Sequence, residues 1–189
     1  MPDALNETSR QLMETAARLS VRNRVLERLL CMFGSAVPAE RIWNDVLDLA
    51  MEAVPCEASS FFLAGSKGAL TIVAARGSVS DKIVGLKLKR GQGLAGACFL
   101  DRRVIAVSDV TRDPRHAAQM AQALGFETRS LLAVPVVHGG DALGVLEVIN
   151  RTGGDEFARH EVDLVERVGR SAGDLLALRA AIHGKGRGR

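Results

Sequence analysis

The first predicted element is a helix over residues 1–35, because its apolar positions recur every seven residues. The main line comprises Leu5, Leu12, Leu19, Leu26 and Phe33, and a more polar line follows at Ser9, Ala16, Asn23 and Leu30. An asparagine in such a seam is the kind of residue that fixes the register of a two-stranded coiled coil. We therefore expect this helix to pair with a second copy; an amphipathic helix packed on its own domain is the alternative.

The remaining pattern changes between helical and strand periods and predicts one α+β domain over residues 36–182. Helical spacing appears after Pro38 as far as Val54, and again over residues 157–181. Between them, apolar runs bounded by turn residues predict strands over 59–63, 70–75, 86–88 and 103–107, and short helices over 94–100 and 116–124.

Two apolar runs flank a Gly139-Gly140-Asp141 turn and predict a β-hairpin. In its second strand, Val145 and Ile149 point to one face, whereas Leu146 and Val148 point to the other. Both faces of the sheet must then be covered. We expect an antiparallel sheet of about six strands, with the terminal helices on one face and the segment 78–125 on the other, enclosing a small-molecule pocket.

Composition narrows the class of protein. The 189 residues are 47% hydrophobic and carry a net charge of +3, and only 4% are aromatic, so a base-stacking nucleic-acid surface is poorly supplied. Residues 183–189 alternate glycine with basic residues, which predicts a disordered tail. No apolar run is long enough to span a membrane, and three scattered cysteines favour a reducing cytoplasm. We expect neither a membrane nor a nucleic acid as partner.

Candidate chemistry is sparse, and we expect no enzyme activity. The histidines and cysteines have no metal-ligand spacing, so no metal site is predicted. The turn Gly91-Gln92-Gly93 could lend backbone N–H groups to an anion or bring a helix close to the sheet. Asp109, Thr111 and Asp113 lack the glycine and glutamate of a calcium loop and predict a capped loop instead.

Four blocks in order resemble the GAF domain, a small-molecule sensor module, over about residues 36–180. They are Gly91-Gln92-Gly93-Leu94-Ala95-Gly96, the run 107–115, the run from Gly125 to Pro135, and Gly144 to Arg151. The resemblance implies a GAF/PAS-like fold whose ligand pocket uses some of seven candidate residues. These are Phe61, Gly93, Gly96, Asp109, Arg115, Arg129 and Ser130.

The third block is similar to GAF domains of cyclic-nucleotide phosphodiesterases and adenylate cyclases, whose binders carry the pattern Asn-Lys…Phe-x3-Asp-Glu. Asn150 and Phe157 match it, Arg151 replaces the lysine, and Glu161 and Val162 replace the acidic pair. The salt bridge of that pattern is then expected between Arg151 and Glu161. The departures leave the ligand unidentified, with a cyclic nucleotide as one candidate.

The resemblance implies a regulatory domain that binds an unknown small molecule and signals as a homodimer through its N-terminal and C-terminal helices. Two alternatives stay open. One is a redox enzyme of the free methionine sulfoxide reductase type, although Ala95 occupies the position where those proteins place a cysteine. The other is a GAF fold used only for dimerisation.

Overall fold

The computed structural model describes residues 2–33, 38–115 and 125–184. Six strands form one antiparallel sheet in the order β3-β2-β1-β6-β5-β4, which confirms the predicted sheet. Their bounds are β1 Cys56–Ala64, β2 Leu70–Arg76, β3 Lys87–Leu88, β4 Ile105–Val107, β5 Leu131–His138 and β6 Asp141–Arg151. β5 and β6 are the predicted hairpin.

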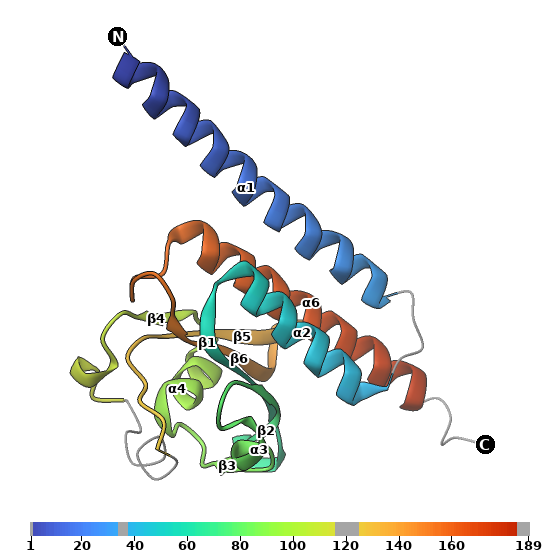
Figure 1. Cartoon of the computed structure of the whole chain (residues 1–189). Helices are drawn as coiled ribbons and strands as arrows, with labels where there is room; N and C mark the ends of the chain where they lie inside the picture. The colour runs from blue at the N-terminus through green and yellow to red at the C-terminus, as the bar shows by residue number, and fades with distance from the viewer. Residues whose placement is uncertain (1, 34–37, 116–124, 185–189) are drawn as a thin grey trace.

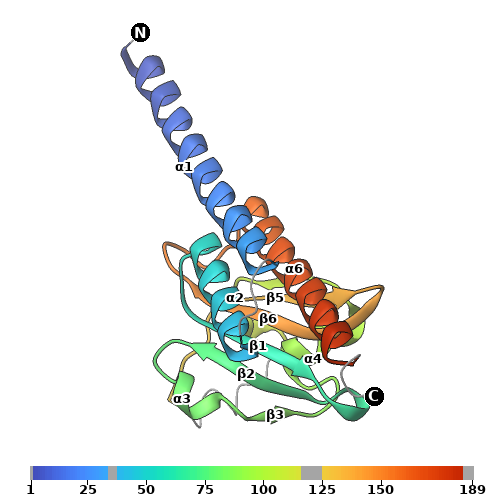
Figure 2. The same cartoon turned by 90° about the vertical axis from the view of Figure 1, so that its right-hand side faces the viewer.

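Helices cover one face of the sheet in two successive layers (Figures 1 and 2). α2 (Ala39–Ala53) and α6 (Arg159–Gly184) lie directly on the strands, and α1 (Pro2–Phe33) runs alongside them on the outside. The core of this side holds buried residues of both layers, and Phe61 of β1 stacks on Trp43 of α2 with ring centroids 5.0 Å apart. The long helices agree with the predicted ones.

α6 approaches the sheet closely because glycine faces β5. A Cβ atom on Gly173 would collide with the carbonyl of Val137, and one on Gly169 would lie 3.1 Å from the side chain of Val134. With no side chain between them, the helix axis can lie closer to the strand than usual, which positions Val168 and Ala172 in the core.

The other face of the sheet is covered by short elements, as expected. These are α3 (Ser80–Ile83), α4 (Gly93–Asp101) and the single 3₁₀ turns η1 (Ser66–Gly68) and η2 (Val110–Arg112). A second core lies under α4, with Phe62 and Val145 from the sheet and Leu94 and Cys98 from the helix. α3 was not predicted, because one helical turn is too short to show a period. The predicted helix 116–124 lies outside the described residues.

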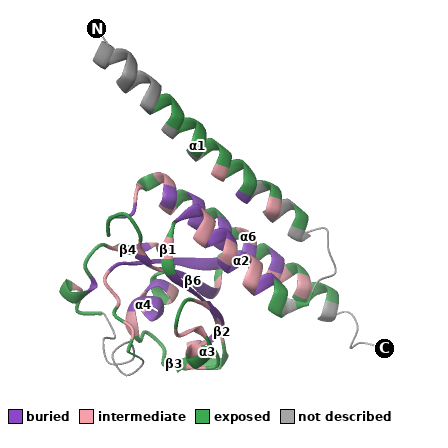
Figure 3. Cartoon of the chain, in the orientation of Figure 1, coloured by how far each residue is buried: buried purple, intermediate pink, exposed green. Residues whose placement is uncertain are grey.

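α1 is only partly packed on its own chain (Figure 3). Val25 is fully buried and Arg28 forms an ion pair with Glu52 of α2 at 2.8 Å, so the second half of α1 contacts the domain. By contrast, Leu12 and Leu19 of the seven-residue line are 66% and 50% exposed. α1 thus packs on its own domain around Val25 and Arg28, and its pairing with a second copy stays a prediction. α6 continues to Gly184, so residues 183 and 184 of the predicted tail are helical instead, and residues 185–189 lie outside the described residues.

Candidate functional site

A cavity of about 130 Å³ lies between the sheet and its cover of short elements. Strands β1, β2 and β6 supply its floor, α3 and α4 supply its cover, and the segment before β5 closes one side through Phe126 and Thr128. Its wall is mostly apolar, as is usual for ligand pockets. The apolar side chains are Phe62, Ile72, Val79, Ile83, Leu88, Leu94, Leu131 and Ile149.

Glu147 is the acidic group of this cavity. It lies in the middle of β6, opposite Ser60 of β1 and Ala133 of β5, and is 6% exposed. The Ser60 hydroxyl donates to one carboxylate oxygen at 3.3 Å, and the Ser59 hydroxyl donates to the Glu147 backbone carbonyl at 2.8 Å. Burial raises the pKa of Glu147 to about 7, only partly offset by the Ser60 hydrogen bond.

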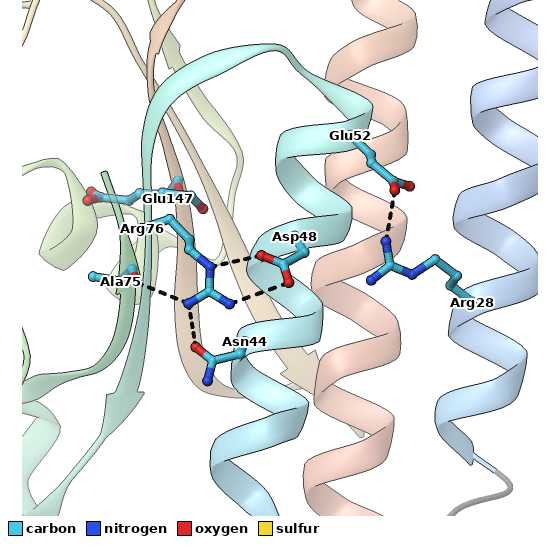
Figure 4. A network of polar contacts seen from close by, with 8 residues as sticks. Arg28, Asn44, Asp48, Glu52, Ala75, Arg76 and Glu147 are labelled. Atoms are coloured by element: carbon cyan, nitrogen blue, oxygen red, sulfur yellow. Dashed lines mark hydrogen bonds and ion pairs between the residues drawn. The ribbon is translucent and has the colours of Figure 1, made fainter. Parts of the chain in front are cut away.

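Arg76 is the cavity's basic side chain and connects the cavity with the helical layer (Figure 4). Its guanidinium donates to Asp48 of α2 from Nε at 2.9 Å and to the Asn44 side chain from Nη1 at 2.6 Å. The ion pair with Asp48 satisfies the charge of Arg76 from the helix side. Among the described residues that line the cavity, Arg76 and Glu147 are the charged ones.

A second polar cluster surrounds Asn150 at the end of β6, outside the cavity. Asn150 is fully buried with a φ of 57°, and its side-chain oxygen accepts from the backbone N–H groups of Arg129 and Ser130 at 2.7 and 3.4 Å. Its amide group donates to Glu57 and to the Glu127 carbonyl, each at 2.7 Å. The hydrogen bonds from Arg129 and Asn150 lower the pKa of Glu57. Asn150 thus anchors the chain entering β5.

The seven predicted site residues are not brought together. Gly93 lines the cavity, whereas Gly96 is buried within α4, where a Cβ atom would lie 2.5 Å from the Gly91 backbone. The turn before α4 therefore packs its backbone directly against the helix at Gly96, which is one of the two predicted roles of this turn. Asp109 caps η2 by accepting from Thr111, Arg115 pairs with Asp113 at 2.7 Å, and neither lines the cavity.

Arg129 and Ser130 also lie outside the cavity wall. Arg129 pairs with Glu57 at 2.7 Å, and the buried Ser130 hydroxyl accepts from the backbone N–H of Arg151 at 3.1 Å. For the adjacent phenylalanines of β1, the choice of Phe61 is corrected: Phe62 lines the cavity and Phe61 faces the helices. Neighbouring residues of a strand face opposite sides, and the sequence does not say which side carries the helices.

Glu147 and Ser60 were not among the predicted site residues. The sequence did contain a signal for Glu147. It is a charged residue in the run Gly144-Val145-Leu146-Glu147-Val148, and it lies two positions after Val145, so both point to the same face of the sheet. A glutamate inside a strand that is apolar on both faces is notable, because glutamate is rarely buried unless it is paired. Cys98 and its helix neighbours lie in the second core, and burial raises the pKa of its thiol. The described residues contain no cluster of three or more metal-binding side chains.

The family follows from a match to a family model. A family model described as "GAF domain" matches residues 38–176, well over half of the chain. This chain belongs to the GAF domain family. The predicted resemblance and the α+β fold are therefore confirmed, and GAF domains are regulatory and sensory modules.

Known relatives extend the comparison. The chain is 25% identical over 153 residues to the cone cGMP-specific 3',5'-cyclic phosphodiesterase subunit alpha' of Mus musculus, an alignment covering 75% of this chain and 18% of the mouse subunit. The GAF domain of a phosphoenolpyruvate-protein phosphotransferase from Coxiella burnetii superposes with a TM-score of 0.76 at 24% identity, covering 90% of this chain and 98% of that one.

An enzyme has the same fold as well. The free methionine-R-sulfoxide reductase of Neisseria meningitidis, solved in complex with its substrate, has a TM-score of 0.67 at 16% identity and covers 87% of this chain and 93% of its own. At such identities the likeness concerns the fold alone. None of the helices within the described ranges is long and apolar enough to cross a membrane.

Proposed function

We propose that this GAF domain is the sensing module of a regulatory system, binding a small molecule in the cavity under α4 and signalling through its terminal helices. The observation that carries the proposal is the position of Arg76. It lines the cavity and is held by Asp48 and Asn44 of α2, so a ligand whose charge or contacts displace Arg76 also acts on the helical layer.

The helical layer offers a route from α2 to the outer helix. α2 contacts both α1 and α6, and Glu52 of α2 accepts from Arg28 of α1 at 2.8 Å (Figure 4). A ligand shifts these helices only to the extent that it binds two helix arrangements with unequal affinity. The exposed Leu12 and Leu19 give α1 an apolar line for a second copy. The proposed output is a change in the pairing of two copies, in the cytoplasm.

The proposal favours binding over catalysis. Among the described residues, the wall of the cavity holds no cysteine or histidine, and Ala95 lines it where the reductases place a cysteine. An open cavity of about 130 Å³ also favours a ligand-binding role over a fold used only for dimerisation. A volume near 150 Å³ accommodates a benzene ring, so the cavity favours a compact ligand over a complete cyclic nucleotide.

The proposal is tested in two steps. Small molecules released from the purified chain by denaturation are identified by mass spectrometry, and these together with cyclic GMP, cyclic AMP and 2-oxoglutarate are titrated calorimetrically. A spin label at residue 17, an exposed position outside the two seam lines, then reports the distance between two copies with and without the ligand that binds. We expect the distance to change, and Arg76→Lys to reduce that change, while Arg103→Lys, an exposed arginine outside the cavity, leaves it intact. A bound ligand with unaltered distances would contradict the signalling role.

A further inference from the structure

The cavity contains a buried carboxyl group that forms no ion pair with a cationic side chain in the part of the chain that the structure describes. Glu147 is 6% exposed, and among the described residues its carboxyl has a single hydrogen-bond partner, Ser60, at 3.3 Å. A carboxylate has about four lone-pair positions to satisfy, and a buried one without partners is costly. The lone pairs of the Glu147 carboxylate that Ser60 does not use are available to a ligand in the cavity that Glu147 lines.

The basic residue of the cavity wall, Arg76, does not hydrogen-bond to Glu147. Arg76 reaches the same cavity, but its guanidinium donates to Asp48 at 2.9 and 3.4 Å and to Asn44 at 2.6 Å, on the helix side of the sheet. In Figure 4, dashed lines join Arg76 to Asp48 and Asn44 of α2, and none joins it to Glu147. Within residues 2–33, 38–115 and 125–184, no side chain therefore supplies a positive charge to Glu147, and a bound ligand is the source that we consider.

The surroundings of Glu147 define the rest of the ligand. Phe62, Ile72, Leu94 and Ile149 give the cavity an apolar wall, which suits an aromatic or aliphatic body. The volume of about 130 Å³ suits a body of about one ring. An anionic ligand would place a like charge next to a buried carboxylate, which is unfavourable at low dielectric.

We propose that Glu147 is the recognition group of this cavity and that its ligand is a compact molecule with a protonated nitrogen, an amine or an amidine, on an apolar body. The nitrogen donates to the carboxylate of Glu147, which Ser60 orients, and the body lies against Phe62 and Leu94. This inference rests on the proposed function, because it names the ligand class of the same cavity.

Three probes of nearly equal shape test the proposal on the wild-type chain. Benzamidinium, benzamide and benzoate carry a positive, neutral and negative group on the same ring, and each is titrated by protein-observed NMR at pH 8. We expect benzamidinium to bind most tightly and benzoate most weakly, with shifted amides on β1, β6 and α4. Equal affinity for the three, or no binding of benzamidinium, would overturn the proposal.

Variants of the carboxyl group complete the test. Glu147→Gln keeps the shape and removes the charge, so it should weaken benzamidinium binding by roughly tenfold to a hundredfold, as expected for a charge-assisted hydrogen bond, and change benzamide little. Glu156→Gln, an exposed glutamate, is the matched control. If benzamide and benzoate bind as well as benzamidinium, this inference fails while the cavity remains a ligand site; if none binds, the proposed function loses its support too.

Discussion

Arg151 and Glu161 join the end of β6 to the start of α6 through paired hydrogen bonds. Nε and Nη2 of Arg151 donate to the two carboxylate oxygens of Glu161, each at 2.9 Å, and Glu161 is 5% exposed. Glu161 also accepts from the backbone N–H of Ala158 at 2.8 Å. The predicted pair is confirmed. Arginine supplies this bridge in place of lysine, with a two-point geometry that lysine cannot match.

Removing the acid of this pair should destabilise the fold. Glu161→Ala leaves the guanidinium of Arg151, whose side chain is 21% exposed, without its main partner, and should lower the free energy of unfolding by about 2 kcal/mol. Arg151→Lys should cost roughly half of that, because the charge stays and the paired geometry is lost. Urea unfolding measures both. Glu156→Ala is the exposed control, and equal stability of Glu161→Ala and this control would refute a structural role for the bridge.

Asn150 should be more sensitive to substitution than any other polar residue at this end of the sheet. Asn150→Ala removes four hydrogen bonds from a fully buried position and adds strain at a φ of 57°, so we expect a loss of about 3 kcal/mol. Asn150→Gly removes the same bonds without the strain and should lose less. Thermal unfolding compares the two, and a glycine variant as unstable as the alanine variant would show that φ contributes nothing.

Glu147 should make stability depend on pH. Its folded pKa of about 7 lies above its ordinary value of 4.5, so the folded state keeps a proton that the unfolded chain loses between these values. Stability therefore falls as pH rises from about 4.5 to 7 and then levels off, by up to about 3 kcal/mol. In Glu147→Gln this contribution should vanish. Chemical unfolding of both chains from pH 4.5 to 8 measures the difference; parallel curves would mean that Glu147 titrates normally.

The close approach of α6 to β5 predicts a severe effect of one methyl group. Gly173→Ala places a Cβ atom on the carbonyl of Val137 and should cost about 2 to 3 kcal/mol by pushing the helix off the strand. At Gly65 the nearest atom to an added Cβ is 3.7 Å away and φ is −102°, so Gly65→Ala is the control and should be nearly neutral. Similar melting temperatures for both variants would show that α6 has room to shift.

The exposed leucines of α1 predict self-association. Replacing Leu12 and Leu19 by lysine removes two apolar side chains from the proposed seam and should weaken dimerisation at least tenfold in sedimentation equilibrium. Val84→Lys, a change at a 49% exposed residue on the loop side of the sheet, should leave it unchanged. A wild-type chain that is monomeric at micromolar concentration would remove the basis for signalling through α1.

Periodicity and turn residues determined the elements of this fold, because these signals are local. The hairpin around Gly139 and Gly140, the apolar faces of β6 and the three long helices followed from spacing alone, and the order of elements then favoured an antiparallel sheet. The Arg151–Glu161 pair was also predictable, since both positions belong to one motif.

The tertiary structure decided which residues form the site. Strand alternation separates Phe61 from Phe62 but does not assign either face to the helices, and only their packing placed Phe62 in the cavity. Likewise, Ser60 and Glu147 are 87 positions apart and meet because β1 pairs with β6. A cavity and the charge balance within it arise from such long-range pairings. The sequence by itself therefore determined the module, and the structure decided that its pocket presents a carboxyl group.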